Sequence, residues 1–101
     1  PSTDNVDHTY WITTALLKNY GIKKEDFKVM LDEFAIDMRP LFYPLSAMPP
    51  FKNYVNKNMR DQNPITYELS DYGICLPNGN NLSEDDIDYI CHHFKKALGV
   101  S

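Results

Sequence analysis

The chain has 101 residues, a formal net charge of −4 and ten dispersed lysines and arginines. A chain of this length folds as one domain with a modest core. It has no basic stripe, and no apolar run approaches the length of about 20 residues that a membrane span needs, so the composition argues against nucleic acid and membranes as partners. We therefore expect a cytoplasmic protein.

The chain begins with a polar stretch that lacks periodicity, so we expect residues 1–8 to be a trimmed linker and residues 9–101 to form the domain. Tyr10–Leu17 is rich in aromatic and β-branched residues and becomes apolar on both faces towards its end. This pattern predicts a central strand. Gly21, in the Asn-Tyr-Gly turn that follows, is expected to take a positive φ.

Apolar residues from Lys24 to Ile36 recur at the spacing of one helix face, which predicts an amphipathic helix. They are Phe27, Met30, Leu31, Phe34 and Ala35. The chain then returns through a second predicted strand at Met38–Tyr43. Because proline lacks an N–H, Pro40 and Pro44 predict that this strand lies at a sheet edge or pairs irregularly.

Three further segments are expected to be ordered before the last helix. Pro49 and Pro50 favour a short helix, after which Asn56–Gln62 is expected to be a loop. Asn63-Pro64 is typical of a helix start and Gly73 of a helix end. The buried side of this helix is predicted to carry Ile65, Leu69 and Tyr72, and Ile74–Leu76 is predicted to be a short third strand.

The last helix is predicted from Ser83, which precedes three acidic residues in the first turn, to Gly99. Its apolar face is expected to contain Ile87, Ile90, Cys91, Phe94 and Leu98. These elements together predict an α+β fold. The sheet should be three-stranded and mainly antiparallel, with the first and last amphipathic helices covering one of its faces.

The residues that could carry metal or thiol chemistry have simpler interpretations. His92 and His93 are adjacent, so on a helix they point about 100° apart and cannot converge on one metal; we expect surface histidines. Cys75 and Cys91 lack the spacing of a zinc or redox pair, and we expect free, buried thiols. The lysines, Lys23-Lys24 and Lys95-Lys96 included, are expected to be solvated. A thiol or metal protein is therefore set aside.

Met38–Phe51 is too apolar for an exposed loop, and four prolines break it into extended pieces. Arg39 places a lone guanidinium in this stretch. A buried or half-buried arginine without a partner is costly, so we expect Arg39 to meet an anion.

From Arg39 to Phe51 the sequence reads Arg-Pro-Leu-Phe-Tyr-Pro-Leu-Ser-Ala-Met-Pro-Pro-Phe. This segment resembles the Arg-Pro, Tyr-Pro-Leu and Met-Pro-Pro motif in the C-terminal part of the DegT or perosamine-synthase-like family, which comprises pyridoxal-phosphate-dependent nucleotide-sugar aminotransferases. Further matches follow in family order, at Tyr10-Trp11 upstream, and at Asn63–Pro77 and Leu82–Ile90 downstream. The resemblance covers residues 9–98.

The resemblance implies the small C-terminal domain of a fold-type-I aminotransferase. The full enzyme would transfer an amino group, commonly from glutamate, to a keto-sugar nucleotide through pyridoxal phosphate, and the parent would be a homodimer. In the family the lysine that forms the Schiff base lies in the large domain, so this chain alone is expected to bind no cofactor, to be inactive, and to contribute part of the substrate wall.

The same resemblance places Arg39, Tyr43 and Ser46 near the mouth through which the sugar nucleotide enters. Many family members carry histidine where this chain has Ser46, which puts an imidazole role in doubt, although a hydroxyl still donates to a sugar or phosphate oxygen. The competing interpretation is that Arg39 pairs with an acidic neighbour and that Tyr43 is a core aromatic. The sequence is compatible with both the substrate-binding and the structural interpretation of these residues.

An alternative function is a stand-alone, non-catalytic α+β interaction module that keeps the fold without the chemistry. In either case one face of the predicted sheet has no cover. Phe42, Met48 and Phe51 are more apolar than an isolated surface favours, so we expect them to dock on the large domain in the parent and on another copy of the chain when it is alone.

Overall fold

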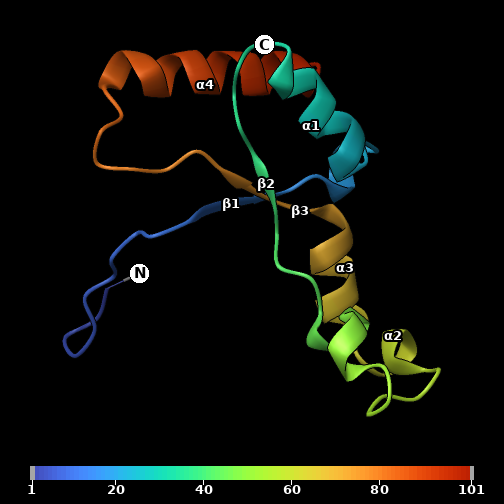
Figure 1. Cartoon of the computed structure of the whole chain (residues 1–101). Helices are drawn as coiled ribbons and strands as arrows, with labels where there is room; N and C mark the ends of the chain where they lie inside the picture. The colour runs from blue at the N-terminus through green and yellow to red at the C-terminus, as the bar shows by residue number, and fades with distance from the viewer. Residues whose placement is uncertain (1, 101) are drawn as a thin grey trace.

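The computed structural model describes residues 2–100 and contains a three-stranded sheet, four α-helices and three short 3₁₀ turns within that range (Figure 1). The elements in chain order are β1 (Thr13–Leu16), a 3₁₀ turn (Lys18–Tyr20), α1 (Lys24–Asp32), β2 (Arg39–Pro40), two 3₁₀ turns (Leu45–Ala47 and Pro49–Phe51), α2 (Met59–Gln62), α3 (Pro64–Tyr72), β3 (Gly73–Leu76) and α4 (Glu84–Ala97). The expected α+β class is confirmed.

The strand order is β1-β3-β2, and both pairings are antiparallel. The expected central position of Tyr10–Leu17 is therefore wrong: β1 is shorter and lies at an edge, while β3 is central. In β1 only one face is covered, and Leu16 is half exposed. The short β2 is the other edge, as Pro40 predicted; after it, the Leu41 N–H donates to the Gly73 carbonyl at 3.0 Å.

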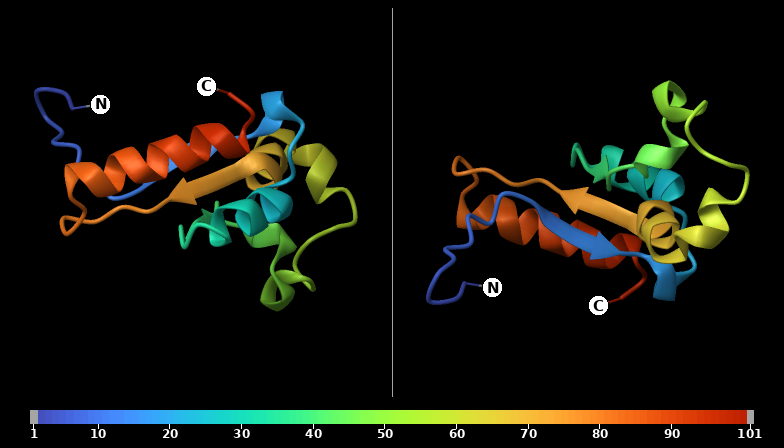
Figure 2. Two further views of the ribbon diagram at one scale, coloured as in Figure 1. Left: turned by 90° about the horizontal axis from the view of Figure 1, so that it is seen from above. Right: turned by 90° about the horizontal axis from the view of Figure 1, so that it is seen from below.

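Helices α1 and α4 cover one face of the sheet, and the strands lie in front of them when the molecule is seen from the other side (Figure 2). The core between these layers consists of Leu17, Phe27, Leu31, Ile36, Met38 and Ile74. The Phe27 ring meets Phe94 of α4 edge to face, with 5.2 Å between the centroids. Edge-to-face pairs of this kind add to the stabilisation from apolar burial.

Helix α1 ends at Asp32, before the predicted end at Ile36. Ala35 adopts a left-handed conformation, with φ of 56°, and the Ile36 N–H donates to the Leu31 carbonyl at 3.1 Å. This is the hydrogen bond of a Schellman turn, which usually places glycine at the left-handed position. Because alanine occupies it here, the helix end carried no signal in the sequence. Gly21, by contrast, has the predicted positive φ.

Two expectations about the region before β3 are wrong. The stretch expected to be a loop contains a helical turn, α2. In α3, the buried residues are Tyr67 and Ser70, whereas Ile65 is 74% exposed. The start of α3 at Pro64 is confirmed, although the Asn63 side chain donates to the Met59 carbonyl instead of capping the helix.

The start of α4 agrees with the sequence. The Asp86 N–H donates to the Ser83 hydroxyl oxygen at 3.1 Å, and the Ser83 N–H donates to the Asp86 carboxylate at 2.9 Å, which is a capping box. The Ser83 hydroxyl also donates to this carboxylate, and the backbone and hydroxyl bonds from Ser83 lower the pKa of Asp86. Only a narrow stripe around Ile90, Phe94 and Leu98 packs on the core. Cys91 lies one residue away from this stripe and is exposed, so its predicted burial is wrong.

His93 of α4 is more enclosed than the surface histidine that was expected. Its ring stacks on Phe34 with 4.0 Å between centroids and lies 4.4 Å from the Tyr89 ring. Its Nδ1 is buried and has no partner among the described residues. Desolvation, followed by the charges of His92 and Lys96, lowers the pKa of His93. The neutral ring therefore fits this position better than the charged one.

This arrangement predicts that stability falls on mild acidification. In the unfolded chain a histidine protonates at a pH of about 6.5, whereas His93 in the folded chain resists the proton, so its contribution is complete above that pH and is lost as the pH falls towards the folded-state pKa. Urea unfolding between about pH 5.5 and 7.5 measures the effect. His93→Gln should flatten the profile in that range, and the neighbouring His92→Gln should leave most of it. An unchanged profile in His93→Gln would contradict the assignment.

Candidate functional site

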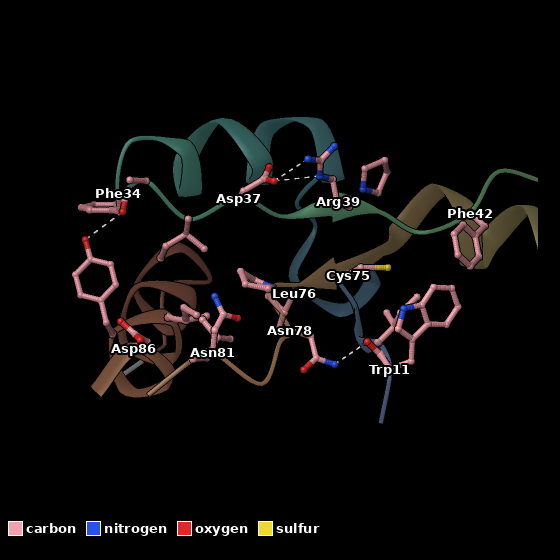
Figure 3. A pocket seen from close by; sticks show the side chains of 18 residues that line it. Trp11, Phe34, Asp37, Arg39, Phe42, Cys75, Leu76, Asn78, Asn81 and Asp86 are labelled. Atoms are coloured by element: carbon pink, nitrogen blue, oxygen red, sulfur yellow. Dashed lines mark hydrogen bonds and ion pairs between the residues drawn. The ribbon is translucent and has the colours of Figure 1, made fainter. Parts of the chain in front are cut away.

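Two cavities flank the proline-rich segment Met38–Phe51. The first has a volume of about 920 Å³ and lies between the end of α1, β2, the end of β3 and the start of α4 (Figure 3). The second, of about 400 Å³, lies between the start of α1, the chain after β2, and helix α3. The first is therefore large enough for a substantial ligand or a protein segment.

Arg39 lines the first cavity but is not buried, because its side chain is 76% exposed. Its Nε donates to the Asp37 carboxylate at 3.0 Å, and a terminal nitrogen forms an ion pair with the same carboxylate oxygen at 2.9 Å. The expectation of a buried or half-buried arginine is thus wrong. The anion that it meets is an acidic neighbour, and such an exposed pair leaves guanidinium donors open to a ligand.

The first cavity also has an apolar part, made by Trp11, Phe42 and the thiol of Cys75 (Figure 3). Trp11 is 74% exposed and Phe42 is 67% exposed. Cys75 is free and buried, as expected, and desolvation raises the pKa of its thiol. A protonated thiol is a poor nucleophile, so this cysteine contributes surface and not reactivity.

The second cavity gathers cations and tyrosines. The Lys24 Nζ lies 4.6 Å from the centroid of the Tyr43 ring, and the Arg60 guanidinium lies 4.7 Å from that of Tyr67. Arg60 also pairs with Asp71 at 2.7 Å, which raises the pKa of Arg60. Cations over aromatic faces are stabilised by the ring quadrupole. This cavity is therefore positively charged on several sides.

Tyr43 lines the second cavity and is exposed, so it is not the core aromatic of the competing interpretation. The Ser46 hydroxyl is 2.8 Å from the Tyr67 hydroxyl, and either oxygen can donate. Ser46 thus borders the second cavity through Tyr67, whereas Arg39 lines the first. The structure brings two of the three predicted residues towards one cavity and leaves the third at the other.

Lys24 is the buried charged residue at the second cavity that sequence reasoning missed. It was expected to be solvated, but it is only 6% exposed, and its Nζ donates to the Ser70 carbonyl of α3. The signal was present in the helix spacing, because Lys24, Phe27 and Leu31 occupy positions i, i+3 and i+7 of one face. Lysines are rarely buried, so the position of Lys24 on the apolar face did not lead to a prediction that it is buried.

The residues of the chain do not fit a complete pyridoxal phosphate site. Such a site needs a lysine for the Schiff base, a carboxylate for the pyridine nitrogen and donors for the phosphate. Lys24 is the buried lysine of residues 2–100, but it contacts a carbonyl and a tyrosine ring, and the nearby Asp71 is engaged by Arg60. Within that range we find no cluster of metal-ligating side chains and no helix able to span a membrane.

The fold and the cavities define a small α+β domain whose proline-rich segment borders two cavities. Residues 1–95 match the DegT/DnrJ/EryC1/StrS aminotransferase family, and the chain belongs to that family. This confirms the resemblance seen in the motifs from Tyr10 to Ile90. Aminotransferases of this family depend on pyridoxal phosphate.

The chain is similar to larger proteins with names that describe the family chemistry. It is 33% identical over 87 residues to the GDP-perosamine synthase of Escherichia coli O157:H7, a match that covers 86% of this chain and 22% of the relative. It is 35% identical over 88 residues to a putative pyridoxal phosphate-dependent aminotransferase, EpsN, of Bacillus subtilis, covering 83% and 22%. The GDP-perosamine synthase of Vibrio cholerae is 28% identical over 89 residues. The chain thus spans under a quarter of the length of these curated relatives.

Proposed function

We propose that this chain is the C-terminal small domain of a nucleotide-sugar aminotransferase. The observation that carries the proposal is the family match over residues 1–95, in a chain that spans only 22% of its relatives. The full enzyme would transfer an amino group from glutamate to a keto-sugar nucleotide. Pyridoxal phosphate, held by the large domain, would carry the amino group between donor and acceptor.

The extended shape of the chain supports the proposal that it packs against another domain. Its radius of gyration is 16.2 Å, whereas a compact domain of about 100 residues has a radius of about 13 Å. Large apolar side chains are exposed beside the first cavity, among them Trp11 and Phe42. We propose that this apolar surface docks on the large domain of the same enzyme, and that the chain alone pairs with a second copy.

Sedimentation tests the docking surface directly. Phe42→Asp places a charge in the exposed apolar patch and is expected to shift the chain from dimer towards monomer, while leaving its fold unchanged because Phe42 lies outside the core. Val29→Asp, also at an exposed apolar position, is the matched control and should not alter the mass. A wild-type chain that remains monomeric at high concentration would contradict self-association.

We propose that Arg39, Tyr43 and Ser46 form part of the substrate wall. The open guanidinium donors of Arg39 suit a phosphate or a sugar oxygen, and charge-assisted bonds of this kind hold a ligand in register. The Tyr43 ring offers an apolar surface, and the hydroxyl pair of Ser46 and Tyr67 offers hydrogen-bond donors and acceptors. These residues would orient the nucleotide sugar; none of them would react.

A chimera tests the proposed function. Residues 9–101 replace the matching segment of the GDP-perosamine synthase of Escherichia coli O157:H7, and amino transfer from glutamate is followed. The chimera should bind cofactor and transfer the amino group, and Arg39→Gln should raise KM about tenfold through loss of a charged hydrogen bond. Lys57→Gln, in an exposed loop, is the control.

The chain without a large domain should give no borohydride-trapped adduct with pyridoxal phosphate, because it does not assemble the groups that the cofactor needs. A chimera that binds the cofactor normally but transfers nothing would contradict the proposal and favour a non-catalytic module. A stoichiometric adduct on one lysine of the isolated chain, with amino transfer, would show that the active site lies here.

A further inference from the structure

The second cavity contains a buried cation for which the proposed function gives no role. Lys24 is 6% exposed and forms no ion pair with any carboxylate of residues 2–100. Its ammonium contacts a neutral carbonyl and the face of the Tyr43 ring. An ammonium has three donors, and burial without a counter-charge is costly, so a partner anion would satisfy both its charge and its remaining donors.

Other groups around the same cavity could complete such a site. Arg60 uses one terminal nitrogen for Asp71, which leaves further guanidinium donors. The Tyr67 hydroxyl, paired with Ser46, lies on the same wall. Helix α1 begins at Lys24 and has no side-chain cap, so the amides of its first turn are also open. Donors therefore approach from α1, α2 and α3.

The carboxylates at this cavity do not neutralise Lys24. Asp71 is held by Arg60 at 2.7 Å, and Glu25 is exposed in the first turn of α1. Lys23 adds a further exposed positive charge at the rim. The charged groups lining the cavity are three cations and two carboxylates, so its charge is positive by one.

We propose that this cavity binds a phosphate-type oxyanion, with the Lys24 ammonium as its central donor and Arg60 as its second. A tetrahedral anion accepts bonds from several directions at once, as these donors require, and a volume of about 400 Å³ admits a phosphate group together with part of a bound ester. Because Tyr43 and the Ser46–Tyr67 pair at this cavity belong to the proposed substrate wall, the inference rests on the proposed function and adds an oxyanion subsite to that wall, but phosphate binding is measured without amino transfer.

Inorganic phosphate is the probe. Thermal unfolding of the chain is followed in phosphate and in chloride at equal ionic strength, and calorimetry measures the affinity. Phosphate at about ten times its Kd should raise Tm by roughly 5 °C or more, with saturation. Lys24→Met should weaken phosphate binding by about tenfold or more, and Arg60→Gln by a smaller factor, because each removes a charge-assisted bond. Acetate should give no saturable shift.

Lys95→Gln, an exposed lysine on α4, is the matched control and should bind phosphate like the wild type. If Lys24→Met fails to fold, phosphate binding by Arg60→Gln tests the proposal instead, because the Arg60 side chain is exposed and its replacement should leave the fold intact. A wild-type chain with no saturable response to phosphate overturns the proposal, as does a response that both variants retain in full or that acetate reproduces. Because no step of amino transfer is measured, failure here leaves the proposed function standing, and an inactive chimera leaves phosphate binding standing.

Discussion

Phe27→Ala is expected to lower the free energy of unfolding by about 3–5 kcal/mol, which is the usual cost of removing a buried phenylalanine ring. Phe27 is fully buried, packs in the core beneath the sheet, and meets the Phe94 ring edge to face. The core is small, so neighbouring side chains cannot fill the space without opening the contact between α1 and α4. Because small domains are stable by only about 5–15 kcal/mol, the variant should be partly unfolded at 37 °C.

Urea denaturation and near-ultraviolet circular dichroism measure this effect. Val29→Ala is the matched control on the same helix, since Val29 is exposed and its truncation should change stability by less than about 0.5 kcal/mol. If Phe27→Ala were as mild as Val29→Ala, the arrangement of α1 over the sheet would be wrong.

Gly73→Ala is expected to destabilise the chain by about 1–3 kcal/mol through overpacking. A Cβ atom at this position would lie 2.3 Å from the Leu69 carbonyl oxygen and 2.7 Å from the Leu41 Cβ. The φ of Gly73 is −85°, which alanine adopts freely, so the loss comes from these contacts alone. Since the Leu41 N–H donates to the Gly73 carbonyl, relief of the clash should also displace the segment that leads to Tyr43.

Gly79→Ala provides the comparison. Its Cβ would approach the Asn81 side chain at 2.6 Å, but that side chain lies in an exposed loop and can rotate away. Chemical unfolding of the two variants should therefore differ clearly, and amide chemical shifts around Tyr43 should move only in Gly73→Ala. Equal and small effects would show that the junction between α3 and β3 has more room than the structure gives it.

Elements whose signals are local could be predicted from the sequence. The start of α4 depends on a serine, an aspartate three residues later and an acidic first turn, all within one helical turn. The edge position of β2 follows from Pro40, which has no N–H to donate. The family was likewise evident from short motifs in a fixed order. In each case the physical cause lies within a few neighbouring residues.

Elements that depend on distant partners could not be predicted. The composition of β1 fits a central or an edge strand equally well, and only its pairing with β3 made it an edge. The burial of Tyr67 in place of Ile65 depends on which face α3 turns to its neighbours. The end of α1 was hidden because alanine occupies a left-handed position that glycine usually marks.

The sequence by itself determined the fold class, the family and the segment from Arg39 to Phe51 as the place of interest, because composition, caps and motifs are properties of neighbouring residues. Only the tertiary structure decided which cation is buried. Arg39 stays in solvent beside Asp37, while Lys24 lies beneath the Tyr43 ring against α3, 46 residues away along the chain at Ser70. Burial and charge pairing are set by segments that meet only on folding, so the order of residues alone does not assign them.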